Sequence, residues 1–526
     1  MNPPALDHEA ANHEAAQREP RVVGTGRATA ALTGVLSAAV ALGVGELAAG
    51  VVGSSSSPVV AVSDAAVRAT PEGLKEFAIA TFGAADKAVL VGGVLVVVLL
   101  WAVGTGLAAR RRPAAGVVAV GLFGLLGAVA AVTGPTGSPL DAVPSVLAGI
   151  AGVGVLLALL PRLQALAAGP DPGRRGVLLA GGAALGAAVV AGGGGLVLQR
   201  RFAVADARED LVLPDPTDPA PALPDGADLA GAVDGLTPLL TSADDFYRVD
   251  TAISVPQLDP STWALSVTGM VDRPGSITLA QLFARPDVVE RDITLTCVSN
   301  EVGGTLAGSA RWLGVPLGPL LREFGVQSGA DQLLCRSSDG MTIGTPTRAA
   351  LEVPDAMLAF GMNGAPLPVE HGFPVRMVVP GLYGYVSACK WLTGIEATTF
   401  DAQDAYWVQR GWAAEGPIRI ASRIDTPVSD AAAGTVVVAG VAWAQGTGID
   451  LVEVRVDDGE WRRAELAPEA TVDLWRQWYL PVQLRSGEHQ VSVRATDADG
   501  RRQPEEQAPP FPSGATGWHT ITVDVA

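Results

Sequence analysis

The sequence is poor in charge and in cysteine. Charged residues make up 17 % of the 526 residues and hydrophobic residues 48 %, and the mean hydropathy is positive. This composition excludes a disordered or fibrous chain. The three cysteines exclude a disulfide framework, and no two of them have the CxxC spacing of a zinc or redox site.

The charge that is present is unevenly distributed. Residues 1–204 contain 14 basic and 11 acidic residues, whereas residues 205–526 contain 22 basic and 43 acidic ones. The first part is a nearly neutral membrane piece. The second is an acidic soluble piece, long enough for one large domain or two ordinary ones. Such an acidic surface argues against nucleic acid as a partner.

Long uncharged runs occupy the first part, and each approaches the roughly 20 residues that a helix needs to cross a bilayer. We therefore expect an all-α region of five transmembrane helices over residues 28–199, with spans near 28–52, 88–109, 114–134, 143–162 and 176–199. No span contains a histidine. A haem held by two histidines inside the anchor is therefore not expected.

Basic residues predict the orientation of these helices. Arginines lie in the tail 1–27, in Arg110–Arg112 between the second and third spans, and between the fourth and fifth spans. All three clusters fall on one side, which should be the cytoplasm. Arg200 and Arg201 run against this pattern without outweighing it. We expect a multi-pass protein of the cell membrane, with a cytoplasmic N-terminus and an extracytoplasmic C-terminal part.

Two features of the membrane region leave alternatives open. Arg174 and Arg175, before a Gly/Ala-rich span, are either plain anchors or a twin-arginine export signal. Such a signal would suit a domain exported already folded around a cofactor. Glu46 lies in the first span, where an unpaired carboxylate costs on the order of 2–3 kcal/mol. It is either a functional carboxylate or a residue that reaches toward the outer interface.

Three segments follow the membrane region. Residues 200–241 are rich in Asp, Pro, Ala and Gly, which predicts a semi-extended linker that sets the soluble part off the membrane. Residues 242–425 contain short strand patterns such as Asp292–Thr296 and helical pieces such as Leu317–Phe324. This pattern predicts an α+β domain with a mixed sheet.

Residues 426–526 have a different pattern, in which alternating segments such as Val436–Trp443 are separated by turns such as Asp457–Gly459. This pattern predicts an all-β sandwich of immunoglobulin type. Its core and rim are expected to contain five tryptophans, Trp443, Trp461, Trp475, Trp478 and Trp518.

Cys297 is the residue around which chemistry is expected. It stands at the end of an alternating strand and is followed by polar residues and by the pair Gly303-Gly304. A lone cysteine is usually a small buried hydrophobe. Here the glycine-containing loop would let the backbone approach a ligand closely, which makes a thiolate site a second interpretation.

Five motifs follow one another along the soluble part: Cys297 and its surroundings, then residues 310–317, 362–376, 379–384 and 390–392. This series resembles the molybdopterin domain of the sulfite oxidase family. The terminal sandwich, with Val441–Trp443 and Val452–Val456, resembles the dimerisation domain appended in that family. The resemblance covers roughly residues 242–525.

The resemblance implies a molybdenum ion held by the dithiolene of molybdopterin and by one protein thiolate, Cys297. A soft thiolate suits a molybdenum centre already bound by sulfur, and it must lose its proton to bind. The phosphate of the pterin requires cations and donors. Arg376 and Lys390 match the phosphate- and pterin-binding positions of the family, and His371 matches a nearby polar contact.

The resemblance implies further contacts. Tyr247 and Arg248 match a pterin-contacting stretch of related sulfoxide reductase subunits, Ser337 is a further candidate, and Trp412 aligns with the substrate-side tyrosine. The predicted catalytic residues are Cys297, Arg248 and Trp412, and Cys297 is the metal ligand. The predicted cofactor-binding residues are Tyr247, Arg248, Cys297, Ser337, His371, Arg376, Cys389 (through its backbone) and Lys390. Each arginine could instead form a surface salt bridge, and His371 could be a satisfied loop histidine.

The sequence departs from true sulfite oxidases just after the ligand cysteine. Glu301 and Val302 stand where those enzymes have paired arginines that bind the oxyanion. A carboxylate there would oppose a dianion. Sulfite is therefore doubtful, and a neutral or organic substrate, for example a sulfoxide, fits better. Trp407 and Trp412 could form a wall of its pocket.

We therefore expect a membrane-anchored oxidoreductase with a Mo-molybdopterin cofactor that transfers an oxygen atom and two electrons on a small substrate. Electrons would be exchanged with an external carrier, a cytochrome c or a quinone-linked one, and the acidic domain could steer a basic carrier. A homodimer is also possible. Two alternatives remain: a cofactor-less surface binding module that uses the immunoglobulin-like domain, and a thiol enzyme with Cys297 as nucleophile and His371 as base.

Overall fold

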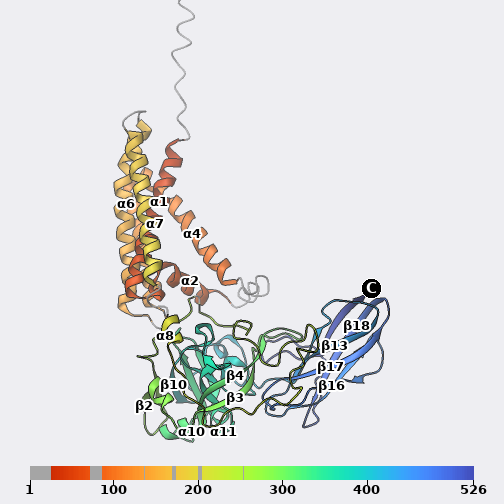
Figure 1. Ribbon diagram of the computed structural model, residues 1–526. Helices are drawn as coiled ribbons and strands as arrows, with labels where there is room; N and C mark the ends of the chain where they lie inside the picture. The colour runs from red at the N-terminus through yellow and green to blue at the C-terminus, as the bar shows by residue number, and fades with distance from the viewer. Residues whose placement is uncertain (1–24, 72–85, 135–136, 169–172, 200–203, 253) are drawn as a thin grey trace, which may run out of the picture. The chain divides into compact units, whose positions relative to one another are not determined.

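The computed structural model describes residues 25–71, 86–134, 137–168, 173–199, 204–252 and 254–526. The chain divides into two compact units, residues 1–202 and residues 203–526. The first unit is helical, and the second contains every described strand (Figure 1). Each unit is described on its own below.

The first unit contains five helices that are long and apolar enough to cross a membrane. They are α1 (Thr25–Val52), α4 (Asp86–Arg111), α5 (Pro113–Val132), α6 (Ala142–Ala168) and α7 (Gly173–Gln199). The expectation of five apolar helices is confirmed, while their orientation stays a prediction. The loop 72–85, which contains Lys75, and the pair Arg200-Arg201 lie outside the described residues. Shorter helical segments were not expected: η1 (Ser54–Ser56), α2 (Pro58–Ala69) and η3 (Pro139–Asp141).

Glycines let α1 and α4 touch backbone to backbone. A Cβ at Gly34 would clash with the carbonyl oxygen of Ala102, and one at Gly106 would clash with that of Ala30. Small residues that allow such close approach are the usual contacts between helices in a membrane. The Gly/Ala-rich composition of these spans thus has a packing role.

Glu46, in α1, is hydrogen-bonded on both carboxylate oxygens. The Ser57 hydroxyl donates to Oε1 at 2.5 Å, and the Gln199 amide donates to Oε2 at 2.8 Å. Ser57 is also the N-cap of α2, where its Oγ accepts from the Val60 N–H at 3.4 Å. The carboxylate therefore links α1 to the start of α2 and the end of α7. These partners reduce the cost of a carboxylate in an apolar segment.

The second unit begins with an α+β part built on two sheets. The first sheet has the order β2 (Gly275–Thr278), β1 (Ala264–Gly269), β10 (Leu392–Thr398), β5 (Gln332–Ser337) and β6 (Thr342–Pro346). Strands β1 and β10 run parallel, and the other neighbours are antiparallel. The predicted mixed sheet is confirmed.

The second sheet of this part has the order β3 (Val289–Thr296), β4 (Ala307–Pro316), β7 (Met357–Met362) and β8 (Ala365–Pro366), with β9 (Arg376–Val378) paired to β7. All six residues of β7 are buried, so apolar side chains pack on both faces of this strand. The short helices are α8 (Ala205–Glu209), α9 (Leu279–Phe283), α10 (Leu317–Phe324), α11 (Thr347–Glu352), η5 (Val369–His371), α12 (Gly384–Ser387) and η6 (Val408–Arg410).

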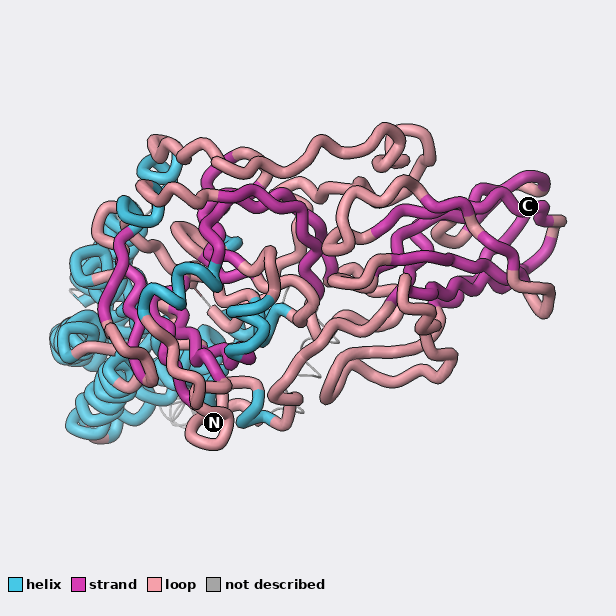
Figure 2. The backbone as a smooth tube through the Cα atoms, turned by 90° about the horizontal axis from the view of Figure 1, so that it is seen from below, coloured by secondary structure: helices cyan, strands magenta, loops and turns pink. Residues whose placement is uncertain are grey.

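The C-terminal part is made of two sheets, as expected for an immunoglobulin-like sandwich (Figure 2). One has the order β11 (Ala421–Thr426), β13 (Gly434–Trp443), β17 (Arg476–Leu484) and β16 (Glu465–Leu466). The other has the order β12 (Asp430–Ala431), β19 (His519–Val525), β18 (Gly487–Asp497), β14 (Ile449–Val456) and β15 (Arg462–Arg463).

The five tryptophans of this part pack in three different environments. Trp478 packs in the sandwich core among valines. Trp443 and Trp475 are equally buried but pack against Leu239 and Ala307, outside the sandwich core. Trp461 and Trp518 form a half-buried pair with ring centroids 4.8 Å apart. Only Trp478 is therefore a core residue of the sandwich itself.

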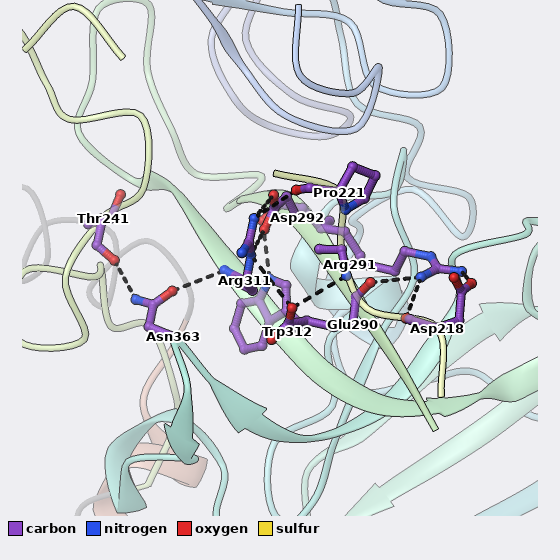
Figure 3. A network of polar contacts seen from close by, with 11 residues as sticks. Asp218, Pro221, Thr241, Glu290, Arg291, Asp292, Arg311, Trp312 and Asn363 are labelled. Carbon is purple, nitrogen blue, oxygen red and sulfur yellow. Dashed lines mark hydrogen bonds and ion pairs between the residues drawn. The ribbon is translucent and has the colours of Figure 1, made fainter. Parts of the chain in front are cut away.

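The segment predicted to be a semi-extended linker is packed along the soluble unit from residue 204 onward. The Thr217 N–H donates to the Val288 carbonyl at 2.8 Å, and the Trp475 indole donates to the Leu239 carbonyl at 2.9 Å. Arg291 pairs with Asp218 at 2.5 Å, as Figure 3 shows. From residue 204 onward the segment fastens the two soluble parts to each other. Buried leucines and specific polar contacts hold these residues against the soluble unit. The role of the segment as a spacer from the membrane stays a prediction.

Candidate functional site

Cys297 follows β3 directly and is buried, with 8 % of its surface exposed. Its N–H donates to the Leu306 carbonyl at 2.9 Å, and its Sγ accepts from the Ser299 N–H at 3.4 Å. Burial raises the pKa of the thiol above its ordinary value, because the interior disfavours the thiolate. The thiol of the protein without metal is therefore protonated at neutral pH.

The loop that follows Cys297 is fixed by its own polar residues. The Asn300 side-chain oxygen accepts from the Leu306 N–H at 2.8 Å, and the Asn300 N–H donates to the Cys297 carbonyl at 3.1 Å. Gly303 has a φ of 78°, which favours glycine. The loop thus presents the sulfur from a defined backbone geometry.

Arg376, in β9, is a buried cation with an incomplete set of partners. Nη1 donates to the His371 carbonyl at 3.1 Å and Nη2 to the Ala388 carbonyl at 3.4 Å, while the guanidinium lies 5.0 Å from the centre of the Trp312 ring. Among the described residues no carboxylate pairs with it, and its buried Nε has no hydrogen-bond partner. Burial lowers its pKa to about 10. A buried guanidinium in this state is suited to an anion.

Lys390 and Arg248 share one carboxylate, that of Asp250. The Lys390 Nζ lies 2.8 Å and the Arg248 Nε 2.7 Å from Asp250 Oδ2. The Asp250 side chain is 2 % exposed, against 10 % for Lys390 and 35 % for Arg248. Burial lowers the pKa of Lys390 to about 8, although Asp250 opposes this shift. The structure therefore places Arg248 at the edge of a buried Lys–Asp pair, and its catalytic role stays a prediction.

His371 and Tyr247 lie against Phe246. The ring centroid of His371 is 5.5 Å and that of Tyr247 5.2 Å from the centroid of Phe246. The His371 Nε2 is 3.1 Å from the Ala243 carbonyl oxygen. Burial and the nearby Arg376 lower the pKa of His371 to about 4, so the ring is neutral at physiological pH. Burial, reinforced by Cys297, raises the pKa of the Tyr247 hydroxyl, which keeps this group a hydrogen-bond donor.

Ser337 is the last residue of β5, and Cys389 directly precedes Lys390, just before β10 begins. The Ser337 Oγ accepts from the Asp339 N–H at 3.5 Å, and the neighbouring Ser338 hydroxyl is buried without a hydrogen-bond partner among the described residues. Cys389 is fully buried and its carbonyl accepts from the Met377 N–H at 3.0 Å. Burial raises the pKa of its thiol strongly. Its sulfur is thus a packing group, and the predicted backbone contact with a cofactor stays a prediction.

Trp412 belongs to an aromatic cluster that adjoins the Cys297 loop. It packs with Trp407 and Tyr385 around Val298, the residue next to Cys297. Its ring centroid is 6.3 Å from that of Trp407 and 5.3 Å from that of Phe511, whose side chain is 45 % exposed. The Trp412 Nε1 is buried without a hydrogen-bond partner among the described residues. This cluster provides an apolar wall with one available donor.

Two family models match the soluble unit. The oxidoreductase molybdopterin binding domain matches residues 252–407, and the Mo-co oxidoreductase dimerisation domain matches residues 418–525. The chain is 30 % identical over 330 residues to the mitochondrial sulfite oxidase of Mus musculus, which covers 52 % of this chain and 59 % of that protein. The chain belongs to the sulfite oxidase family.

Other proteins are similar to a comparable extent. Sulfite oxidase of Gallus gallus is 29 % identical, over 51 % of this chain and 69 % of that protein. Nitrate reductase [NAD(P)H] of Hordeum vulgare is 28 % identical, over 48 % of this chain and 35 % of that protein. The sulfane dehydrogenase SoxCD from Paracoccus pantotrophus aligns with a TM-score of 0.48 and 23 % identity, over 56 % of this chain and 82 % of that chain. The match thus spans about three fifths of the mouse protein.

Membership of the sulfite oxidase family implies the Mo-molybdopterin cofactor, and the residues present fit it. Arg376 is a buried cation without a carboxylate, and its Nε is available. Lys390 is a second buried cation. Cys297 supplies a buried thiol, the donor that a thiophilic metal requires. Cations for the phosphate and a sulfur for the metal are therefore both present.

Sequence reasoning missed Asp250 and Trp312. From the sequence, Asp250 would be taken for a surface carboxylate that pairs with the nearby Arg248. Only the fold shows that it is buried against Lys390. Trp312 lies in the motif 310–317 that carried the resemblance, but nothing in that motif indicates that its ring lies beside Arg376. Both contacts join segments far apart in the sequence.

Proposed function

We propose that this chain is a membrane-anchored molybdenum-cofactor oxidoreductase that transfers an oxygen atom and two electrons on a small substrate. The observation that carries the proposal is Arg376, a buried guanidinium with no carboxylate partner among the described residues and an unused Nε. Keeping such a charge buried is costly unless an anion completes the site. The terminal phosphate of molybdopterin is that anion.

The residues of the chain have separable roles in this proposal. Arg376 and Lys390 bind the phosphate, and Asp250 holds the Lys390 ammonium in place at 2.8 Å. Cys297 loses its proton when its sulfur binds the metal, which offsets the burial that otherwise raises its pKa. Neutral His371 adds no further positive charge beside Arg376. When bound, the cofactor supplies a centre that exchanges two electrons as an oxygen atom is transferred.

The proposed substrate is a small neutral or organic molecule such as a sulfoxide. The names of the relatives denote sulfite and nitrate, both anions. Here the loop after Cys297 presents the exposed carboxylate of Glu301, and the aromatic cluster with Trp412 adjoins Val298. A carboxylate repels an anionic substrate, whereas aromatic rings favour an organic one. The Trp412 N–H is the donor proposed to contact the substrate oxygen.

The proposal includes where the enzyme acts and with what. The five apolar helices support membrane anchoring, and the distribution of arginines supports a catalytic part outside the cytoplasm. Electrons would be exchanged with an external carrier, either a cytochrome c or a quinone-linked one. The acidic soluble part would steer a basic carrier, so turnover should fall as ionic strength rises. The dimerisation-type domain supports a homodimer.

The test of this proposal compares Arg376→Gln with the control Arg494→Gln. The Arg494 side chain is 12 % exposed, so it too is largely buried, but it pairs with Glu453 in the sandwich. After expression with an intact cofactor pathway, we expect the Arg376 variant to lose molybdenum and pterin at least about tenfold, because a charged hydrogen-bond donor to the phosphate is lost. The control should retain both. Equal retention in the two variants would contradict the proposal.

The same samples separate the two alternatives. A cofactor-less binding module would contain no molybdenum in wild-type protein either. A thiol enzyme would lose activity when Cys297 is alkylated in metal-free protein. The neutral His371 hydrogen-bonds to a backbone carbonyl through Nε2 at 3.1 Å, which does not favour it as the base of that alternative.

A further inference from the structure

The loop after Cys297, which contains Gly303 and Gly304, is hydrogen-bonded by a side chain of the C-terminal domain. Arg423, in β11, donates from Nη1 to the Gly304 carbonyl at 3.0 Å. Its Nε donates to Asp425 at 2.6 Å, and its Nη2 to the Thr237 hydroxyl at 2.9 Å. The side chains of Arg423 and Asp425 are 7 % and 6 % exposed. Each of the three guanidinium nitrogens thus has a partner, and the partner of Nη1 is the loop.

A second side chain of the same domain packs on the same loop. A Cβ added to Gly303 would collide with the imidazole ring of His519, at the start of β19. The His519 Nδ1 accepts from the Ile424 N–H at 3.0 Å, which fixes the orientation of the ring beside Arg423. The loop backbone therefore lies directly against the C-terminal domain, and only a glycine fits at this point.

The strand before Cys297 is held from the same side. The Thr294 N–H donates to the Asp473 carbonyl at 2.9 Å, and the Thr294 Oγ1 accepts from the Trp475 N–H at 2.8 Å. The Gln445 amide donates to the Thr294 carbonyl. The chain is thus anchored to the C-terminal domain both before and after the cysteine.

We infer that Arg423 is a positioning residue for Cys297: it fixes the Gly303-Gly304 turn and, through it, the direction of the sulfur toward the metal. This inference rests on the proposed function, in which Cys297 is the metal ligand. Loss of the Arg423 contact leaves the partly buried Gly304 carbonyl without its donor, and the loop can then leave its position. The immunoglobulin-like domain thereby takes part in building the metal site.

The test uses the reactivity of Cys297 in metal-free protein. The rate of alkylation by iodoacetamide is measured for each cysteine-containing peptide by mass spectrometry, with the buried Cys335 and Cys389 as internal references. Arg423→Met should raise the Cys297 rate about tenfold or more, because a charged hydrogen bond to the loop is lost. Arg423→Lys, which keeps the charge without the planar fork, should restore part of the protection.

The control is Arg494→Met, which breaks a similar pair with Glu453 elsewhere in the same domain. It should leave the Cys297 rate within about twofold of wild type, since it makes no contact with the loop. Thr237→Val keeps the Arg423–Asp425 pair and should raise the Cys297 rate about threefold, so it replaces the methionine variant if that one does not fold. A Cys297 rate unchanged in Arg423→Met, or equal increases at all three cysteines, would overturn the inference.

A measurement on loaded protein completes the test. The electron paramagnetic resonance signal of the reduced molybdenum centre should change in Arg423→Lys and remain as in wild type in Arg494→Met. An unchanged signal in the lysine variant would count against a positioning role. If wild-type protein binds no molybdenum, the proposed function fails, while the alkylation result still decides whether Arg423 fixes the loop.

Discussion

Two buried arginines of the soluble unit, Arg376 and Arg423, differ in how many hydrogen-bond partners their guanidinium groups have. Arg376 and Arg423 are 5 % and 6 % exposed. Within the described part of the chain, Arg376 donates only to two backbone carbonyls and its Nε has no partner. Arg423 has a carboxylate, a hydroxyl and a carbonyl as partners. Burial alone therefore does not distinguish a ligand-binding arginine from a structural one.

The difference in partners is what separates the two roles. A fully paired guanidinium stabilises the fold only as long as its partners stay in place. A guanidinium without an acid weakens the fold until a ligand supplies the negative charge. The first kind should thus be sensitive to loss of a protein partner, and the second to loss of the ligand.

The largest effect is expected when the satisfied arginine loses its acid. Asp425→Ala leaves Arg423 buried without its carboxylate, which should lower the free energy of unfolding by about 3–5 kcal/mol. The measurement is denaturant unfolding of the purified protein. Asp457→Ala, which removes an exposed carboxylate paired with the half-buried His489, should cost less than about 1 kcal/mol. Equal losses would remove the distinction between the two kinds of site.

The buried His371 should make the free energy of unfolding depend on pH. Its pKa is about 4 in the folded protein and 6.5 ordinarily, so the unfolded chain binds the proton more readily between these values. Stability should then fall as the pH decreases from 6.5 to 4, by about 3 kcal/mol at pH 4. Asp473, with a pKa raised to about 6, acts in the opposite direction. The measurement is therefore the difference between wild type and His371→Gln, and no difference across this range would contradict the prediction.

Asp250 pairs with two proposed cofactor-binding residues, Lys390 and Arg248. Its removal should have an intermediate effect on the free energy of unfolding. Asp250→Asn weakens the contacts of Lys390 and Arg248, at 2.8 and 2.7 Å. Because Arg248 is partly exposed, we expect a loss of about 2 kcal/mol in metal-free protein, measured by denaturant unfolding. Glu370→Gln, which changes a neighbouring side chain with no ion pair among the described residues, is the matched control. A greater loss in the control would show that Asp250 is not the anchor of Lys390.

The smallest effect on stability is expected at Arg376 itself. In metal-free protein, Arg376→Met removes a buried charge that has no acid, so the free energy of unfolding should stay within about 1 kcal/mol of wild type or increase. The same variant should fail to retain the cofactor. A loss comparable to that of Asp425→Ala would mean that Arg376 is a structural residue.

The sequence allowed much of the fold to be predicted, since helices and strands follow local periodicity. The piece Leu317–Phe324 is helical as expected, and five apolar helices are present. The packing of the linker was not predicted, because its composition is that of an extended chain, whereas buried Leu236 and Leu239 hold it against the soluble unit. Composition does not reveal a partner surface contributed by another domain.

The site could be predicted only as far as the ordered motifs reach. Cys297, His371, Arg376 and Lys390 lie in those motifs. In the fold the first three are buried and the Lys390 side chain is 10 % exposed, while their roles stay predictions. Arg423 was missed because its contact with Gly304 joins residues distant in the chain, and no local pattern indicates such a pairing. The same is true of Asp250 and Lys390.

The most direct test of the account is the molybdenum content of purified protein beside that of three cysteine variants. We predict about one molybdenum per chain in wild type, Cys335→Ser and Cys389→Ser, and loss of the metal or an altered electronic spectrum in Cys297→Ser alone. Cys335 and Cys389 are the matched controls because both are fully buried thiols. Absence of molybdenum from wild-type protein made with an intact cofactor pathway, or an unchanged centre in Cys297→Ser, would contradict the account.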